Sequence, residues 1–258
     1  MIQALTQPGL KLGLGLLSIG RMWGVGQSEP PDAEGAQALL AKALELGIAI
    51  FDTAPAYART EARLGHFLSG LEPSRRRTLT IMTKAGEHWD FEKGTSFVDH
   101  SRDALIRSID RSLKLLGSID VLQLHKATSA VVTHPDVIAA MDHARRCGVT
   151  AFGASVSDPE TGRLALESGL YDALQFPLNL SYNIMAPLLP VLEASPCLTI
   201  VNRPFAMGGL LTGQTIEAAA AAAFHHIEER LPNAVILSGT GKAPHLEENV
   251  RAFHRRRA

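Results

Sequence analysis

The sequence predicts an α/β protein, a (β/α)8 TIM barrel that forms a single domain over residues 1–258. One unit recurs along the chain: an amphipathic helical stretch, a glycine and then a short apolar run. Alternating helices and strands fold either as an open, doubly wound sheet or as a closed barrel. About eight such units in about 250 residues is the usual size of the barrel. No proline- or serine-rich linker divides the chain, so we expect one domain.

Four helix-to-strand junctions carry the glycine that commonly ends a helix. Gly47, Gly117, Gly148 and Gly169 each follow a helical stretch and lead into an apolar run. A glycine just past a helix end supplies the left-handed cap. The predicted helices are 33–46, 60–69, 101–116, 136–147, 159–168, 187–194, 215–230 and 243–254. The predicted strands are 12–18, 48–51, 79–83, 119–124, 149–153, 171–174, 198–202 and 233–237.

The composition is that of an ordinary globular protein, with 46% hydrophobic and 20% charged residues. A formal net charge of -1 gives no reason to expect nucleic acid or an acidic membrane surface as a partner. Cys147 and Cys197 have neither the number nor the spacing for a disulfide framework or a zinc site. We therefore expect no metal and a reducing, cytoplasmic location. The apolar stretch at 9–15 is too short to span a membrane.

Six polar residues stand at or just after the ends of six predicted strands. They are Asp52, Lys84, His125, Ser155, Gln175 and Arg203. In such a barrel the functional site lies at the C-terminal ends of the strands, so these side chains should converge there with Tyr57. Each residue alone has a structural explanation, since a strand-end aspartate can cap a helix and a lone tyrosine usually packs in the core. A lysine, however, is rarely buried without a partner.

The combination of these side chains favours carbonyl chemistry. A tyrosine has an ordinary pKa of about 10, too high for efficient proton transfer at neutral pH. The ammonium of Lys84 would lower the pKa of Tyr57, Asp52 would hold the lysine, and His125 would orient a carbonyl oxygen. Such a set is a general acid with its tuning residues, but it contains no source of hydride. The chemistry therefore requires a reduced cofactor.

A phosphate-binding segment is predicted after the last strand. Residues 238–242, with the sequence SGTGK, precede the last helix. Small residues there let backbone amides approach a phosphate at the helix N-terminus, and barrels often bind phosphate in this region. The alternative is an ordinary turn. No glycine fingerprint of the Rossmann type follows a strand.

At this point the chain resembles the aldo-keto reductase family, over about residues 12–253. The family's D-T-A-x-x-Y signature is similar to residues 52–57, DTAPAY, with Glu61 and Leu64-Gly65 following it. Further matching motifs are Lys84, residues 122–125 (LQLH), residues 153–155 (GAS), Gln175, residues 203–205 (RPF) and residues 208–213 (GGLLTG). The ordered set is highly specific.

The resemblance implies a barrel that binds NADPH or NADH in an extended pose. Tyr57 would donate the proton, Lys84 and Asp52 would tune it, and His125 would orient the carbonyl. The implied cofactor-binding residues are Ser155, Gln175, Arg203, Phe205, Gly208, Ser238, Gly239, Thr240, Lys242, His245, Glu248 and Asn249. Ser155 and Gln175 would hold the nicotinamide carboxamide, and Glu248 and Asn249 the adenine.

Several positions depart from the family pattern. Val156 stands where the family has an asparagine, and Asn202 stands where it has the aromatic that stacks on nicotinamide. Arg203 replaces the usual serine. His245 aligns with the arginine often used for the 2′-phosphate, so the preference for NADP(H) over NAD(H) rests mainly on Lys242. The predicted substrate-lining residues are Trp23, His88 and Trp89.

The expected function is NAD(P)H-dependent reduction of an aldehyde or ketone to an alcohol. The same residues would serve an NAD(P)-dependent dehydrogenase of a sugar or lactol. Because the family includes potassium-channel β subunits, a non-enzymatic, cofactor-binding regulatory subunit is a second class of function. A third is a phosphate-handling barrel enzyme that binds no nucleotide. Substrate identity and oligomeric state are not predicted.

Overall fold

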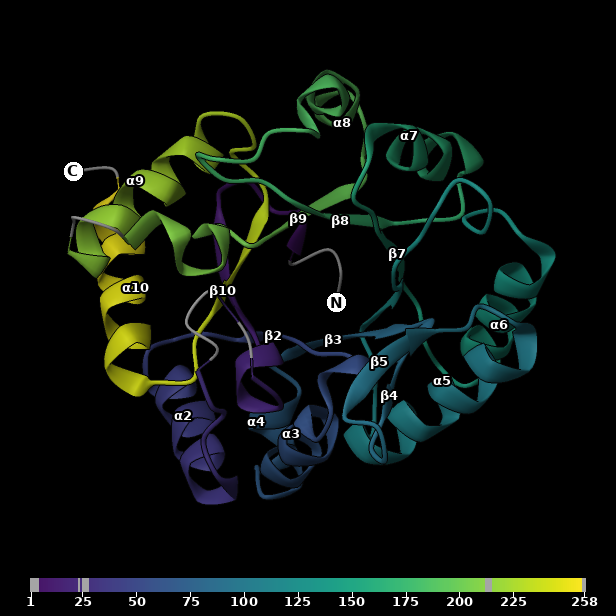
Figure 1. Ribbon diagram of the computed structural model, residues 1–258, viewed down its shortest axis with the longest axis horizontal. Coiled ribbons are helices and arrows are strands. Elements are labelled where there is room, and N and C mark those ends of the chain that lie inside the picture. The colour runs from purple at the N-terminus through teal and green to yellow at the C-terminus, as the bar shows by residue number, and fades with distance from the viewer. Residues whose placement is uncertain (1–4, 23, 25–27, 212–214, 257–258) are drawn as a thin grey trace.

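The computed structural model describes residues 5–22, 24, 28–211 and 215–256. Its centre is a closed barrel of parallel strands surrounded by helices (Figure 1). Around the barrel the strands follow the order β1-β10-β9-β8-β7-β6-β3-β2. The barrel strands are β1 (Lys11–Gly15), β2 (Ile50–Asp52), β3 (Thr80–Ala85), β6 (Val121–Leu124), β7 (Phe152–Ser155), β8 (Ala173–Pro177), β9 (Leu198–Asn202) and β10 (Val235–Gly239). The predicted (β/α)8 barrel is confirmed.

The outer helices lie where the sequence predicts them, with small shifts at their ends. They are α2 (Ala33–Glu45), α3 (Thr60–Ser69), α5 (Arg102–Leu116), α6 (Pro135–Arg146), α7 (Pro159–Ser168), α8 (Leu189–Glu193), α9 (Ile216–Glu228) and α10 (Ala243–Arg255). The four junction glycines all have positive φ, between 65° and 95°. The first predicted strand is too long at its end, because Leu17–Ile19 form the 3₁₀ helix η1.

The inner face of the barrel changes from apolar to polar along each strand. Side chains two residues apart on a strand share one face. Ile50, Met82 and Val121 belong to the buried cluster in the barrel interior, and Asp52, Lys84 and Gln123 follow them two residues later. Ala173 and Gln175 repeat the pattern on β8. The inward-facing side chains therefore form an apolar plug inside the barrel. Beyond this plug, at the C-terminal ends of the strands, they form a ring of polar groups.

Two glycines make this interior packing possible. A Cβ added to Gly13 would lie 3.0 Å from side-chain carbons of both Ile50 and Leu237. A Cβ added to Gly153 would lie 2.9 Å from Cγ of Gln123. Both glycines occupy inward-facing positions, so their missing side chains leave room for the larger residues of neighbouring strands.

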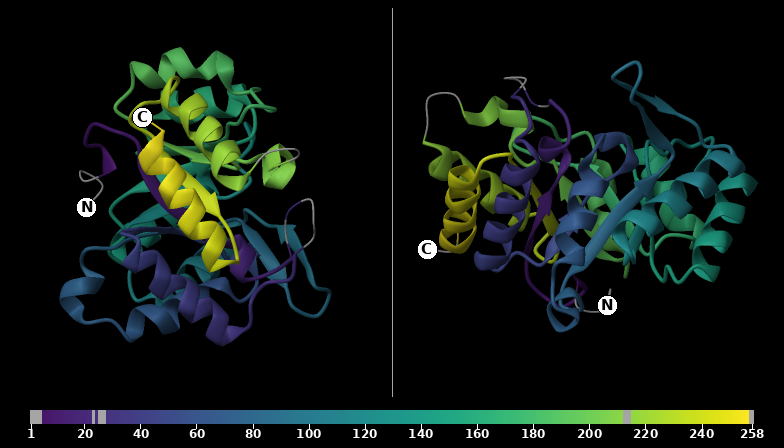
Figure 2. Two further views of the ribbon diagram at one scale, coloured as in Figure 1. Left: turned by 90° about the vertical axis from the view of Figure 1, so that its left-hand side faces the viewer. Right: turned by 90° about the horizontal axis from the view of Figure 1, so that it is seen from below.

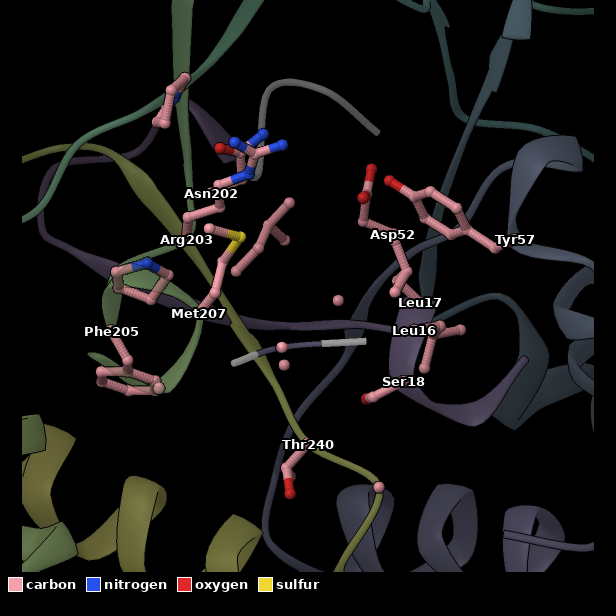
Figure 3. A pocket seen from close by; sticks show the side chains of 18 of the residues that line it. Leu16, Leu17, Ser18, Asp52, Tyr57, Asn202, Arg203, Phe205, Met207 and Thr240 are labelled. Carbon is pink, nitrogen blue, oxygen red and sulfur yellow. The ribbon is translucent and has the colours of Figure 1, made fainter. Parts of the chain in front are cut away.

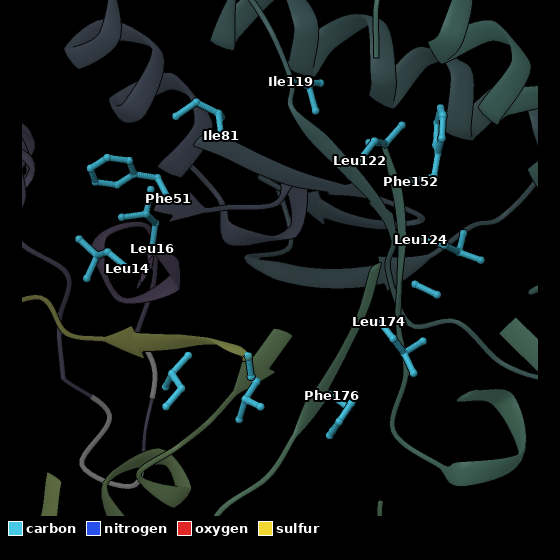
Figure 4. Close-up of a cluster of buried hydrophobic side chains, with 14 of the residues drawn as sticks. Leu14, Leu16, Phe51, Ile81, Ile119, Leu122, Leu124, Phe152, Leu174 and Phe176 are labelled. Carbon is cyan, nitrogen blue, oxygen red and sulfur yellow. The ribbon is translucent and has the colours of Figure 1, made fainter. Parts of the chain in front are cut away.

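A second apolar layer joins the outside of the barrel to the helices. Phe51, Ile81, Leu122 and Leu174 alternate with the inward-facing residues and are 4% exposed or less. Figure 4 shows these side chains pointing away from the barrel interior toward the surrounding helices. Full burial of a Leu, Ile or Phe side chain contributes about 1.5–3 kcal/mol to folding, so this layer fixes the strands that carry the site.

A hairpin of β4 (Glu87–Asp90) and β5 (Thr95–Val98) is a feature that the sequence analysis missed. It stands out from the body of the molecule in Figure 2. Its outer residues are polar or exposed and lack the apolar run by which the barrel strands were recognised. The short helix α4 (Pro73–Arg76) was missed as well. No helix in the described chain is long and apolar enough to cross a bilayer.

Candidate functional site

A cavity of about 620 Å³ lies at the C-terminal ends of the barrel strands. Of the predicted site residues, it is lined by Asp52, Tyr57, His125, Ser155, Gln175, Arg203, Phe205, Gly208, Gly239, Thr240, Lys242, His245 and Asn249. In Figure 3, Asp52 and Tyr57 stand on one wall and face Asn202 and Arg203 on the other. The volume lies within the range of about 300–1,000 Å³ that is typical of small-molecule and cofactor sites.

Lys84 lies behind the cavity wall, paired with Asp52. Its ammonium is 2.5 Å from Oδ2 of Asp52 and 3.0 Å from the carbonyl oxygen of Thr53. The other carboxylate oxygen of Asp52 accepts a hydrogen bond of 2.9 Å from the side-chain amide of Gln123. Burial by itself lowers the pKa of Lys84, but Asp52 and Tyr57 outweigh that effect and raise the pKa overall. Lys84 is therefore a fixed positive charge.

Tyr57 lies between this cation and His125. The Lys84 ammonium is 5.0 Å from the centre of the Tyr57 ring. The Tyr57 and His125 rings meet edge to face, 5.8 Å apart. Burial is the largest influence on the pKa of Tyr57 and raises it overall. Lys84 lowers the pKa, but by less than burial raises it, so the prediction that Lys84 brings the Tyr57 pKa below its ordinary value is wrong. The phenol is therefore protonated at neutral pH, which is the form a proton donor needs.

The backbone of Tyr57 is held by a tight approach of two loops. Tyr57 ends the 3₁₀ helix η2 (Pro55–Tyr57), and its carbonyl oxygen accepts a hydrogen bond of 2.6 Å from the Thr60 hydroxyl. A Cβ added to Gly20 would lie 1.9 Å from that same carbonyl oxygen. Only glycine at position 20 allows this contact, so the chain after β1 fixes where the Tyr57 ring points.

His125 follows β6 and is buried. Its Nδ1 lies 3.2 Å from Oε2 of Glu87, on the hairpin strand β4. Burial is the main reason that the pKa of His125 is well below its ordinary value, and the positive charges of Lys84, Lys126 and Arg21 add to the effect. The imidazole is therefore neutral at neutral pH.

Several buried polar atoms near the C-terminal ends of the strands and on α10 have no hydrogen-bond partner among the described residues. Among the described residues, Oε1 of Gln175, Oδ1 of Asn202 and Oε2 of Glu248 are buried and have no hydrogen-bond partner. A buried acceptor without a partner is costly, so each suits a ligand N–H group. Gln175 on β8 and Asn202 on β9 line the cavity, whereas Glu248 lies on α10 and is not among the lining residues.

The segment after β10 is suited to phosphate groups. Gly239, Thr240, Gly241 and Lys242 line the cavity between β10 and α10. A Cβ on Gly241 would lie 3.2 Å from the carbonyl oxygen of Ser18, so this segment packs against the loop after β1. Small residues at a helix N-terminus leave backbone amides open to an anion.

Four of the described residues that were predicted to bind cofactor or substrate are not among those that line the cavity: Ser238, Glu248, His88 and Trp89. Ser238 is fully buried, and its hydroxyl accepts a hydrogen bond of 2.9 Å from the Asn249 amide. His88 stacks on Phe97 in the hairpin, with ring centres 5.3 Å apart. Trp89 carries the Arg21 guanidinium over its ring at 5.0 Å, so it supports a cavity residue instead of lining the cavity. Trp23, Thr212 and Gly213 lie outside the described residues.

Many residues that line the cavity were missed by the sequence analysis, among them the polar residues Ser18, Arg21, Glu87 and Lys126. Glu87 precedes His88 and Trp89 on the same strand, and the sequence analysis selected the aromatic pair over the carboxylate. Lys126 directly follows His125 and has a left-handed backbone with φ of 54°, unusual for a residue other than glycine. The position of Lys126 directly after His125 was the one sequence feature that could have indicated its place at the cavity.

The loop between β9 and α9 covers the cavity opposite Tyr57. Arg203, Ala206 and Met207 all have positive φ, between 48° and 60°. Non-glycine residues in this region cost about 1–3 kcal/mol each and tend to cluster at functional sites. A Cβ added to Gly24 would lie 3.1 Å from the Met207 carbonyl oxygen, so the loops after β1 and β9 meet at this point.

Comparison with known proteins gives one consistent family. The model of the aldo/keto reductase family matches residues 11–256. An uncharacterized oxidoreductase of Bacillus subtilis is 26% identical over 81% of this chain and 65% of its own length. The L-glyceraldehyde 3-phosphate reductase of Escherichia coli K12 is 31% identical over 70% of this chain and 55% of its own. The chain thus spans less than two thirds of the length of these curated relatives.

Solved structures share the fold over nearly the whole chain. A candidate aldo-keto reductase from Pseudomonas aeruginosa has a TM-score of 0.79 and 30% identity, and the match covers 96% of this chain and 90% of that one. The glycerol dehydrogenase of Gluconobacter oxydans has a TM-score of 0.75 at 22% identity, covering 94% and 86%. At that identity the likeness concerns the fold alone.

Proposed function

Because the chain belongs to the aldo/keto reductase family, we propose that it is an NAD(P)H-dependent oxidoreductase that reduces an aldehyde or ketone to an alcohol. One observation carries the proposal: the Tyr57 ring stands at the cavity with the fixed Lys84 cation 5.0 Å from its centre and His125 at its edge. A phenol held protonated beside a positive charge is a proton donor for an oxygen that becomes negative during reduction.

In this mechanism NAD(P)H supplies the hydride. Tyr57 donates its proton to the carbonyl oxygen as negative charge develops there. Lys84 stabilises the phenolate that remains, and Asp52 holds Lys84 in place through the contact of 2.5 Å. Gln175 and Asn202 would offer their unpartnered oxygens to the amine of the carboxamide, and Glu248 on α10, which is not among the cavity-lining residues, would offer one to the adenine amine.

NADP(H) is proposed over NAD(H) on the strength of Lys242. This lysine is exposed at the cavity edge, next to the small residues at the start of α10. A 2′-phosphate at that point would gain a charge-assisted hydrogen bond, which is stronger than a neutral one.

Substrates that carry a negative charge are favoured by two further cations. Arg21 and Lys126 line the cavity and both lower the pKa of His125, so both lie near the carbonyl end. No ion pair holds Lys126 in the described part of the chain. A phosphate or carboxylate on the carbonyl compound would pair with the Lys126 ammonium. The relative from Escherichia coli, named for a phosphorylated aldehyde, is consistent with such a substrate.

The test is the oxidation of NADPH and NADH, followed by absorbance, with a panel of small aldehydes and ketones. Tyr57→Phe is the informative variant, and Tyr182→Phe, at an exposed tyrosine, is its matched control. We expect turnover that is lost in Tyr57→Phe and kept in Tyr182→Phe. Tight nucleotide binding without turnover in either direction would instead support the regulatory-subunit function, and oxidation of sugars or lactols alone would support the dehydrogenase.

A further inference from the structure

Asp110, His143 and Cys147 form a cluster on the outer helical layer of the barrel. Asp110 lies on α5, His143 lies on α6, and Cys147 directly follows α6. The two helices pack side by side (Figure 1). The carboxylate, the imidazole and the thiol each offer one atom, and these three atoms all lie within 4.8 Å of one another. None of the three residues lines the cavity, so the mechanism above does not use them.

The end of α6 places His143 and Cys147 on one face. Residues four apart on an α-helix are neighbours on its surface. The backbone N–H of Cys147 donates a hydrogen bond of 3.1 Å to the His143 carbonyl oxygen, so the helical spacing still holds at this end. Sγ of Cys147 lies 3.7 Å from Nε2 of His143. The last turn of a helix carries partial negative charge, which favours a cation there.

Nε2 of His143 faces both of the other groups at once. It lies 2.7 Å from Oδ1 of Asp110 and 3.7 Å from Sγ of Cys147. A ring nitrogen carries either one proton or one lone pair, so it can form a good hydrogen bond with only one of two partners. A divalent cation, in contrast, accepts electron pairs from an imidazole, a carboxylate and a thiolate together. The arrangement therefore suits a metal ion better than a shared hydrogen.

A nucleophilic triad uses similar residue types, but its geometry is different. In such a triad the nucleophile contacts one ring nitrogen of the histidine, and the group that orients the ring contacts the other nitrogen. Here Asp110 and Cys147 both contact Nε2. Asp110 cannot orient the ring from the far side while Nε2 takes a proton from the thiol. The cluster therefore lacks the geometry of a triad.

The spacing of the three groups is close to that of a zinc site. Zn²⁺ binds a thiolate at about 2.3 Å and an imidazole or carboxylate at about 2.0–2.2 Å, so tetrahedral ligand atoms are roughly 3.3–3.7 Å apart. The contact of 3.7 Å between Cys147 and His143 already meets this spacing. The Asp110 oxygen would have to move away from Nε2 by about 0.6 Å. The His143 and Asp110 side chains are 23% and 55% exposed, which leaves room for that movement.

We propose that Asp110, His143 and Cys147 bind a Zn²⁺ ion that links α5 to α6, with water in the fourth position. Thiolate and imidazole are ligands that Zn²⁺ prefers, whereas Mg²⁺ and Ca²⁺ take oxygen ligands. The proposal goes beyond the proposed function and does not depend on it. It also replaces the expectation of no metal, which considered the number and spacing of the two cysteines. The third ligand comes from a different helix, which cysteine spacing does not reveal.

The first test is titration of the untagged, chelator-treated protein with Zn²⁺, in competition with a chelating indicator and with the cysteines kept reduced. We expect one ion per chain. Loss of even an outer partner of a metal ligand costs about 10-fold to 100-fold in affinity. Cys147→Ala and His143→Gln should therefore each weaken Zn²⁺ binding by about 100-fold or more, and Asp110→Asn by about 10-fold or more.

Two matched controls should keep the wild-type affinity. Cys197→Ala removes the other cysteine of the chain, which is half-buried at the start of β9. His66→Gln removes an exposed histidine on α3. Co²⁺ then identifies the sulfur ligand, because a cobalt–thiolate bond absorbs strongly in the near ultraviolet. The band should appear in the wild type and in Cys197→Ala and be absent from Cys147→Ala.

A second test asks whether the ion links the two helices. An ion that binds the folded state and not the unfolded state stabilises the fold. Saturating Zn²⁺ should therefore raise the urea midpoint of the wild type and leave that of Cys147→Ala unchanged. Circular dichroism without metal checks that each variant is folded.

Two results would overturn the assigned ligands: Zn²⁺ affinity in Cys147→Ala equal to that of the wild type, or a cobalt–thiolate band that disappears with Cys197 instead of Cys147. An unchanged urea midpoint of the wild type at saturating Zn²⁺ would overturn the link between α5 and α6, since the unfolded chain would then bind the ion equally well. None of these measurements needs turnover, so they decide the zinc site whether or not the protein reduces a carbonyl.

Discussion

Lys84 and Asp52 form an ion pair of 2.5 Å in which neither side chain is more than 5% exposed. The pair lies where the apolar plug of the barrel gives way to the cavity. Removing two charges from water is costly, so such a pair survives only when each charge has its partner in good geometry. The hydrogen bonds from Gln123 to Asp52 and from Lys84 to the Thr53 carbonyl oxygen supply the remaining contacts.

Asp52→Asn should destabilise the fold strongly, because it leaves the Lys84 ammonium buried without its counter-charge. We expect a loss of about 3–5 kcal/mol in the free energy of unfolding, measured by urea denaturation. The double variant Asp52→Asn with Lys84→Met should regain part of that loss, since no uncompensated charge remains. Equal stability of the single and double variants would contradict the assignment of the cost to the ion.

Lys126→Gln should weaken reduction of anionic carbonyl compounds selectively. Loss of one charge-assisted contact is worth about 1.5–3 kcal/mol, so KM for a phosphorylated or carboxylated aldehyde should rise about 10-fold or more. KM for a neutral aldehyde of the same length should barely change. Lys114→Gln, at an exposed lysine on α5, is the control. A matching rise in KM for both kinds of aldehyde would show that Lys126 does not read charge.

Lys242→Ala should weaken NADPH more than NADH. The 2′-phosphate is the only difference between the two nucleotides, and the loss of its contact should cost roughly 1–2 kcal/mol of binding free energy. Fluorescence titration of both nucleotides measures the difference without any substrate. Equal losses for both would remove Lys242 as the residue that selects the phosphate.

Glu61→Gln should stabilise the protein increasingly as the pH rises. Burial raises the pKa of Glu61 above its ordinary value, although the hydroxyls of Ser112 and Thr83 oppose this. The folded state therefore binds the Glu61 proton more tightly than the unfolded state, and this stability is lost as the pH rises through the shifted pKa. Glutamine is neutral at every pH and can still accept the hydrogen bond of 2.7 Å from Thr83. The urea midpoints of both proteins at acidic and mildly alkaline pH test this; a constant difference would contradict it.

The barrel and its outer helices could be predicted because period and glycine caps are local signals. Gly47 and Gly169, for example, end their helices with positive φ as expected. The β4–β5 hairpin could not be predicted, since its stability comes from pairing between Glu87 and Val98 and between Asp90 and Thr95 instead of an apolar face. A polar strand has no sequence pattern that separates it from a loop.

The candidate site, too, contains some residues that the sequence predicts and others that it does not. The residues that line the cavity from barrel strands, such as Asp52 and Gln175, follow from the rule that function lies at the C-terminal strand ends. Glu87 and Arg21 come from the hairpin and the loop after β1, and their distances to His125 depend on how those segments fold back. His88, predicted to contact the substrate, stacks on Phe97 in the hairpin and is not among the residues that line the cavity.

The barrel closes where its first strand pairs with its last, from Lys11 opposite Val235 to Gly15 opposite Gly239. Gly241 and Ser18 pack together just beyond this seam, where the proposed phosphate-binding segment lies. Because β10 pairs with β1, the barrel can close only after the last strand has been synthesised. During synthesis, the other seven barrel strands leave the ribosome before β10 and α10 exist, so a nucleotide can gain little from the nascent chain. A nucleotide that binds as proposed would therefore stabilise the barrel only after β10 has closed it.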